Sequence, residues 1–225
     1  MIVSHKHRFI LLRTEKTGGT SIQSVLAQFC DPGDLITGIG GTPSRELGPE
    51  WTRYPILRRG WLRRTSPRLF SLHTHATARQ VRAAIGRQTF DSYFKFTVER
   101  NPWDRQVSLY FQRRSRSGRD SASDFDRNMR SALFRHTHYT RLRNWDVYSI
   151  DGSVCVDRVL MYHNLEQELA DVMKLLGLPQ NVPLPAKRSG FRPGGRCYRD
   201  FYTDFTRDLI GRWYKREIDA FGFEF

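Results

Sequence analysis

The chain has 225 residues, 39% of them hydrophobic and 13% aromatic, which predicts one domain of ordinary size with a real core and excludes a disordered protein. Its net charge of +14 predicts an anionic partner: nucleic acid, an acidic membrane surface, a polysaccharide or a charged nucleotide. No apolar run approaches the ~20 residues that cross a bilayer. The three cysteines, Cys30, Cys155 and Cys197, are widely spaced without a Cys-x-x-Cys pair, so we expect a reducing compartment and no zinc site.

The N-terminal region predicts a strand, a glycine loop and a helix in succession. The apolar run at 9–12 is typical of a short buried strand. Residues 15–20 then form the loop, and 21–29 a helix that Thr20 or Ser21 can cap. This order opens an α/β domain. Residues 31–67, rich in Gly, Pro and Arg, are expected to be irregular.

Further strands and helices alternate along the rest of the chain, which indicates a mainly parallel central sheet. The segments follow in order: a helix at 77–86, a strand at 93–98, a helix after Asn101-Pro102, a strand at 156–162, a helix at 165–176, a basic Pro/Gly loop at 179–196 and a closing helix at 198–221. We expect a single domain over 1–225.

The glycine loop has the chemistry of a phosphate cradle. Glycines let main-chain N–H groups approach a phosphate, and a helix N-terminus adds donors and a favourable dipole. The residues concerned are Lys16, Thr17, Gly18, Gly19, Thr20 and Ser21. A Walker A loop would need its lysine after the glycines, whereas here the lysine comes first. Taken alone, the string is equally compatible with a plain strand-to-helix turn.

A second motif lies at the end of the strand at 93–98. Arg100 follows that strand, and Ser108 comes eight positions later inside the next helix. Ligands of open α/β sheets bind beyond the carboxyl ends of the strands. Arg100 and Ser108 are therefore expected to bind one anion there.

These two motifs resemble those of the sulfotransferases that use 3′-phosphoadenosine 5′-phosphosulfate (PAPS), particularly the bacterial and carbohydrate branch. The resemblance implies a P-loop-like, three-layer α/β/α fold with a mainly parallel sheet. It also implies that the loop at 16–21 binds the 5′-phosphosulfate and that Arg100 and Ser108 bind the 3′-phosphate. Asn101-Pro102-Trp103-Asp104-Arg105 is similar to the family's own sequence, whereas 31–69 matches nothing in it.

The resemblance extends to the C-terminal half. Leu160 to Leu165 is similar to a strand end of the family, and the resemblance implies that its tyrosine, here Tyr162, lies near the nucleotide. His163 stands where the family usually has an acidic residue. A basic loop covers the 3′-phosphate in the family. The corresponding loop here contains Lys187, Arg188, Arg192 and Arg196, and we select Arg188 for this role. The segment from Tyr198 is similar to the family's closing helix.

Sulfuryl transfer needs a general base for the acceptor hydroxyl and a cation near the leaving oxygen. Lys16 suits the second task. A histidine suits the first, because its ordinary pKa lies near neutrality. Among seven histidines, His75 fits the pattern of the carbohydrate branch best, followed by His73. The two histidines alone do not complete a metal site, and the chemistry requires no metal.

The predicted reaction moves the sulfuryl group of PAPS to a hydroxyl of a carbohydrate or glycolipid, leaving PAP as product. The alternatives are a P-loop kinase or NTPase, which would need Mg²⁺, and a nucleic-acid-binding protein, which would need a binding module that we do not find. We therefore expect no nucleic-acid partner. The arginines between 53 and 68 either form a solvated face or contact an anionic surface, such as a glycan or lipid head groups. The lack of an apolar anchor favours a cytoplasmic enzyme. The acceptor's identity and the oligomeric state are not predicted.

Overall fold

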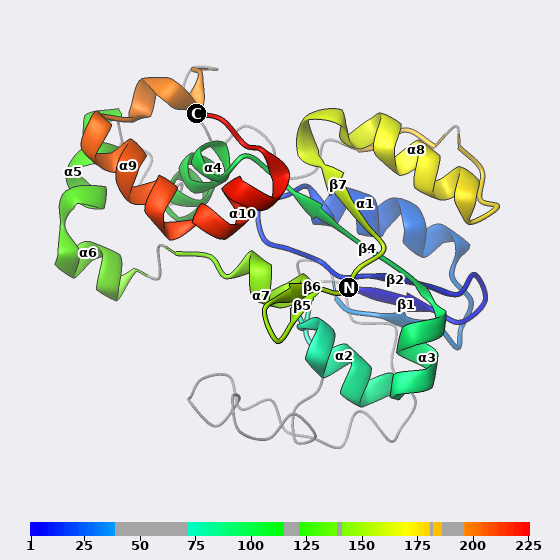
Figure 1. Cartoon of the computed structure of the whole chain (residues 1–225). Coiled ribbons are helices and arrows are strands. Elements are labelled where there is room, and N and C mark those ends of the chain that lie inside the picture. The colour runs from blue at the N-terminus through cyan, green and yellow to red at the C-terminus, as the bar shows by residue number, and fades with distance from the viewer. Residues whose placement is uncertain (39–71, 115–121, 139–140, 181, 186–195) are drawn as a thin grey trace. The chain divides into compact units, whose positions relative to one another are not determined.

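A computed structural model describes residues 1–38, 72–114, 122–138, 141–180, 182–185 and 196–225 (Figure 1). The chain divides into two compact units that alternate along the sequence. Unit 1 comprises Met1–Val98 and Asn144–Pro185, and unit 2 comprises Glu99–Arg143 and Ala186–Phe225. The described residues contain no helix long and apolar enough to cross a membrane.

The central sheet is mixed, with most of its strands running in one direction. Its strands, in spatial order, are β3 (Leu35–Ile36), β1 (Ile2–Ser4), β2 (Phe9–Leu11), β4 (Phe94–Glu99) and β7 (Arg158–Met161). β1 pairs antiparallel with both β2 and β3, so these two share a direction, and β4 pairs parallel with β2. The prediction of an α/β fold with a mainly parallel sheet is confirmed, with β1 as the exception among these four strands.

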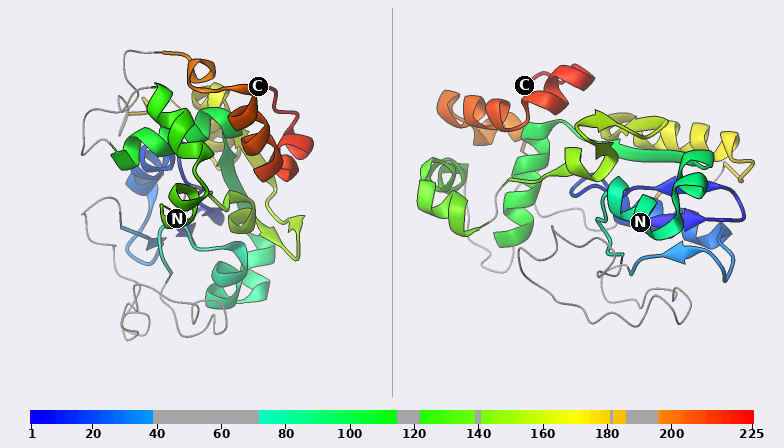
Figure 2. Two further views of the ribbon diagram at one scale, coloured as in Figure 1. Left: turned by 90° about the vertical axis from the view of Figure 1, so that its left-hand side faces the viewer. Right: turned by 60° about the horizontal axis from the view of Figure 1, so that its bottom comes forward.

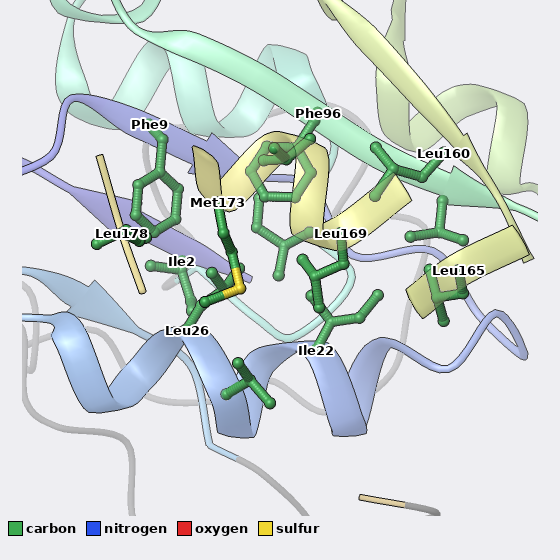
Figure 3. Close-up of a cluster of buried hydrophobic side chains, with 14 of the residues drawn as sticks. Ile2, Phe9, Ile22, Leu26, Phe96, Leu160, Leu165, Leu169, Met173 and Leu178 are labelled. Carbon is green, nitrogen blue, oxygen red and sulfur yellow. The ribbon is translucent and has the colours of Figure 1, made fainter. Parts of the chain in front are cut away.

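Two helices pack on the sheet in unit 1: α1 (Gly19–Leu26) and α8 (Leu165–Leu175). Figure 3 shows Ile22 and Leu26 of α1 meeting Leu169 and Met173 of α8 against strand residues such as Phe96. All of these side chains are buried. Burial of apolar side chains on this scale is the main stabilisation of unit 1. It also anchors α1, whose first turn follows the glycine loop.

Shorter elements complete unit 1. They are η1 (Ala27–Phe29), α2 (Ala78–Ile85), α3 (Arg87–Ser92), α7 (Asn144–Tyr148), the hairpin β5 (Ser149–Ile150) and β6 (Ser153–Val154), and η4 (Tyr162–Asn164). α2 begins with a capping box, in which Thr77 and Gln80 each bond the other's main chain, and ends at Gly86. Its neighbour α3 follows directly (Figure 1).

Unit 2 is helical. Its elements are α4 (Pro102–Arg114), α5 (Ala122–Arg130), α6 (Ala132–Thr137), η6 (Tyr198–Phe201), α9 (Asp204–Trp213) and α10 (Lys215–Phe221). α4, α5 and α9 lie close together in the ribbon views of Figure 2. They enclose an aromatic core, to which Tyr110, Phe125 and Tyr214 contribute.

The predicted closing helix at 198–221 is wrong as one continuous element. Thr203 forms a capping box with Thr206 and starts α9 afresh after η6. Tyr214, with φ −115°, then separates α9 from α10. The strand and helix predicted at 156–162 and 165–176 are present as β7 and α8. The helix predicted at 21–29 begins two residues earlier, at Gly19, and continues into η1.

Candidate functional site

The glycine loop joins β2 to α1 in unit 1, as predicted. Gly18 is the residue before α1 and has φ 76°, a left-handed conformation that glycine adopts without strain. Its carbonyl accepts from the N–H groups of Ser21 and Ile22 at 2.9 and 3.3 Å, which starts the helix. The first helical turn leaves main-chain N–H groups without helical partners at Gly19 and Thr20, the feature on which anion binding at helix N-termini depends.

Gly18 and Tyr162, which sequence reasoning assigned to one ligand, are neighbours within unit 1. A Cβ on Gly18 would lie 3.2 Å from Cε2 of Tyr162 and 3.0 Å from Cδ2 of Leu165. Only a glycine allows the loop to approach η4 and α8 this closely. The half-buried ring of Tyr162 therefore borders the loop.

The hydroxyls of the loop differ in what they can offer a ligand. Thr17 is buried, and its Oγ1 lies 2.8 Å from Oγ1 of Thr14, whose own hydroxyl donates to the carbonyl of Val98. Any contact of Thr17 with a phosphate would thus use its main chain. Thr20 accepts from Nη2 of Arg13 at 2.5 Å, which leaves its hydroxyl proton for another acceptor.

Arg13, which sequence reasoning did not select, connects the loop, the helix and a histidine. Its guanidinium is buried beside α1, where Nη1 donates to Gln23 at 2.8 Å. A Cβ on Gly19 would come within 2.7 Å of its Cγ, so the second glycine makes room for this side chain. The carbonyl oxygen of Arg13 lies 2.8 Å from Nδ1 of His75. An arginine at the end of an apolar strand is the signal that could have revealed it.

The contact with Arg13 fixes the tautomer of His75. A carbonyl oxygen only accepts, so Nδ1 donates, and in the neutral ring the lone pair lies on Nε2. Burial lowers the pKa of His75 below its ordinary 6.5; the carboxylate of Glu15 and the bond to Arg13 oppose this shift, and the charges of Arg13 and the amino terminus add to it. His75 is therefore poised as a neutral acceptor of a proton at Nε2.

His73 has a different environment. Its Nδ1 accepts from the main-chain N–H of His75 at 3.1 Å, in the turn before α2. In the neutral ring the only lone pair is then already used, and Nε2 bears the proton. The geometry makes His73 a support for the His75 main chain.

Asn144 is a second residue that sequence reasoning missed. Its side chain donates to the carbonyl of Glu15 and accepts from the N–H of the same residue, both at 3.0 Å. The two residues are 129 positions apart, and no local pattern indicates the pairing.

Arg100 and Ser108 lie in unit 2 and have a local environment of their own. Arg100 pairs with Asp104, from Nε at 2.7 Å and from Nη2 at 2.6 Å. Within α4, Ser108 lies one helical turn beyond Asp104, so these two residues share one face of the helix, and Arg100 precedes it. The main-chain N–H of Arg100 donates to Glu99 at 3.1 Å.

Glu99 in turn belongs to a buried ion-pair network in unit 2. It accepts from Arg105 at 2.5 Å, and Arg105 also reaches Glu217 of α10 at 3.3 Å. The guanidinium of Arg105 lies over the ring of Tyr214, 4.5 Å from its centroid. Glu99 thus holds the main chain of Arg100, and Asp104 holds its side chain. The sequence around Arg100 did not indicate their role.

Some predicted features lie outside the described residues: Arg188 and the arginines between 53 and 68. Within the described residues, no three His, Cys, Asp or Glu side chains are grouped so that they could hold a metal ion.

The fold and the loop define an α/β protein with a P-loop-like strand–loop–helix element. The chain also matches the sulfotransferase family over residues 1–224, essentially its whole length. It therefore belongs to the sulfotransferase family. An uncharacterized protein of Archaeoglobus fulgidus is 35% identical over 106 residues, which cover 45% of this chain and 82% of that protein. No solved structure matches the chain significantly.

Proposed function

We propose that this protein transfers the sulfuryl group of PAPS to a hydroxyl of a carbohydrate or glycolipid acceptor. The observation that supports this most is the hydrogen bond from Nδ1 of His75 to the carbonyl of Arg13, because it leaves Nε2 as the basic atom of the ring and holds His75 to a residue three positions before Lys16. Membership of the sulfotransferase family gives the reaction class.

In the proposed step the acceptor oxygen attacks sulfur in line with the leaving phosphate oxygen. Its proton passes to Nε2 of His75, the new O–S bond forms, and the bond from sulfur to the 5′-phosphate oxygen breaks to release PAP. Negative charge grows on that oxygen, where the ammonium of Lys16 would stabilise it. The proposed mechanism requires no metal.

The remaining assignments follow the same proposal. Gly18, Gly19, Thr20, Ser21 and the main chain of Thr17 would bind the 5′-phosphosulfate, with Tyr162 alongside the nucleotide. Arg100 and Ser108 would bind the 3′-phosphate, with Arg188 as the loop residue that covers it. His73 would support His75.

At the level of the whole chain, we propose a three-layer P-loop-like arrangement that functions as one sulfotransferase domain, since the family match spans both units. A cytoplasmic location and the absence of a nucleic-acid partner remain predictions from the sequence.

Thermal unfolding with PAP tests the cofactor assignment. A ligand that binds only the folded state stabilises it, so PAP should raise the melting temperature, and EDTA should leave the shift unchanged. Stabilisation by Mg-ATP but not by PAP would favour the kinase alternative and overturn the proposal. A panel of sugars, glycolipids and small alcohols, incubated with labelled PAPS, would then identify the acceptor class.

A further inference from the structure

Asn144 contacts the start of the glycine loop through both polar atoms of its side-chain amide. Its side chain is 1% exposed, and its amide oxygen and nitrogen bond the N–H and the carbonyl of Glu15, each at 3.0 Å. An amide paired with both main-chain groups of one residue fixes that residue's position and its peptide planes together. An aliphatic side chain in its place would leave both of these main-chain groups without these bonds.

The residue after Glu15 has an unusual backbone. Lys16 has φ 64°, in the left-handed region that costs a non-glycine residue about 1–2 kcal/mol. Such a conformation persists only where the surroundings impose it. Here the residues on both sides are anchored: Glu15 by Asn144, and the buried Thr17 by Thr14.

We propose that Asn144 is a positioning residue that, through Glu15, holds Lys16 in its left-handed conformation and so aims its ammonium at the sulfuryl donor. This inference rests on the proposed function, because it gives Lys16 its ligand. It assigns to α7, which neither motif includes, a defined part in the reaction.

The contact between Asn144 and Glu15 also affects His75, through the charge of the Glu15 carboxylate. Burial lowers the pKa of His75; the Glu15 carboxylate and the bond to the Arg13 carbonyl favour the imidazolium, whereas the charges of the Arg13 guanidinium and the amino terminus oppose it. If Asn144 holds Glu15, its loss should move the carboxylate and change the titration of His75. A residue that only stabilised the fold would leave that titration unaltered.

The test is a double-mutant cycle on PAP affinity, measured by calorimetry. Asn144→Ala should weaken PAP about tenfold or more, the scale of one charge-assisted hydrogen bond. Lys16→Gly adopts the left-handed conformation without strain and lacks the ammonium, so adding Asn144→Ala to it should change PAP affinity little. Equal losses in both backgrounds would overturn the inference.

Two further measurements keep the test decisive. The control variant is Asn128→Ala, which removes the hydrogen bond from the Asn128 side-chain amide to the Tyr110 hydroxyl, 2.7 Å long, in unit 2. It should leave PAP affinity and the NMR titration of His75 at wild-type values. If Asn144→Ala does not fold, Asn144→Ser is an uncharged variant whose shorter side chain cannot bond both main-chain groups of Glu15, and it should shift the His75 titration in the same direction. An unchanged titration in a folded Asn144 variant contradicts the inference, whereas wild-type protein that fails to bind PAP contradicts the proposed function itself.

Discussion

Two histidines separated by one residue receive opposite hydrogen-bonding roles from the main chain around them. His75 donates through Nδ1 to Arg13, and His73 accepts through Nδ1 from His75. The sequence predicted a histidine base and preferred His75, but only the tautomers give a physical reason for the order. His73 would have to give up its bond to the main chain before it could accept a proton.

Replacing each histidine in turn should distinguish the proposed general base, His75, from the residue that supports its main chain, His73. His75→Ala should bind PAP normally and lose about 10²–10⁴-fold in turnover, the usual contribution of a general base. His73→Ala should lose less, because the His75 ring keeps its bond to Arg13. Single-turnover kinetics with an acceptor from the panel would measure both. A dead His73→Ala with a near-normal His75→Ala would reverse the assignment, and activity in both would exclude a base in this segment.

Gly18 and Gly222 allow strain and crowding to be compared at two left-handed glycines. Gly18 has φ 76° and a crowded Cβ position, whereas Gly222 has φ 64° and nothing within 4 Å of its Cβ position. Gly222→Ala should therefore cost only the left-handed strain, about 1–2 kcal/mol. Gly18→Ala should cost more in urea unfolding and should also weaken PAP. A PAP loss in both variants would show that the effect is not local to the loop.

At the scale of helices and strands, the sequence predicted the elements with strong periodicity and capping signals, and it missed those that depend on tertiary contacts. α8 and α2 have clear apolar spacing, and α2 ends at a glycine. β1 has three residues and is defined by its pairing with β2 and β3, which no local pattern reveals. The closing segment has continuous helical character, but the cap at Thr203 divides it.

In the candidate site, too, the sequence indicated the residues that form local motifs and missed those that depend on tertiary contacts. Its glycine loop and its Arg-to-Ser spacing are local strings, so the sequence could indicate them. Arg13, Glu99 and Asn144 take their roles from partners brought close by the fold: in the case of Asn144, a residue 129 positions away. Their chemistry as isolated residues is that of many buried polar side chains.

Helix α10 contributes one carboxylate, that of Glu217, to a buried ion-pair network, and we expect this contact to stabilise unit 2. Glu217 is 4% exposed and pairs with Arg105, which is 1% exposed and also bonds Glu99. Glu217→Gln would leave Arg105 paired with Glu99 but would remove the charged bond from Arg105 to α10, and a hydrogen bond to a charged group contributes about 1.5–3 kcal/mol. Glu217→Gln should therefore lower the free energy of unfolding markedly.

Lys215 on the same helix is the matched control. Its pair with Asp219 is exposed, so Lys215→Ala should change the free energy of unfolding by less than about 1 kcal/mol. Chemical denaturation of both variants would test the contrast. Similar small losses would mean that the network tolerates the neutral amide and that α10 is held by its apolar contacts alone.

On the scale of the whole molecule, the two proposed phosphate-binding motifs lie in different units. The glycine loop belongs to unit 1, and Arg100 with Ser108 belongs to unit 2. The chain passes between the units after Val98, Arg143 and Pro185, so neither unit is one continuous segment. The proposed function therefore assigns the 5′-phosphate to residues of unit 1 and the 3′-phosphate to residues of unit 2, and the protection of each unit by a ligand can be measured separately.

Hydrogen exchange with two ligands tests this assignment. PAP has both phosphates and should slow exchange in the first turn of α1 and at the start of α4. Adenosine 5′-phosphosulfate, which lacks the 3′-phosphate, should protect α1 chiefly.

Arg100→Ala should remove the protection of α4 by PAP and weaken PAP binding by about 1.5–3 kcal/mol, while affecting the binding of adenosine 5′-phosphosulfate little. Because Asp104 holds the Arg100 side chain at 2.6–2.7 Å, Asp104→Asn should reduce the preference for PAP by loosening that side chain. Equal losses of both ligands in Arg100→Ala would instead place Arg100 at the 5′ end of the nucleotide or in the support of unit 2.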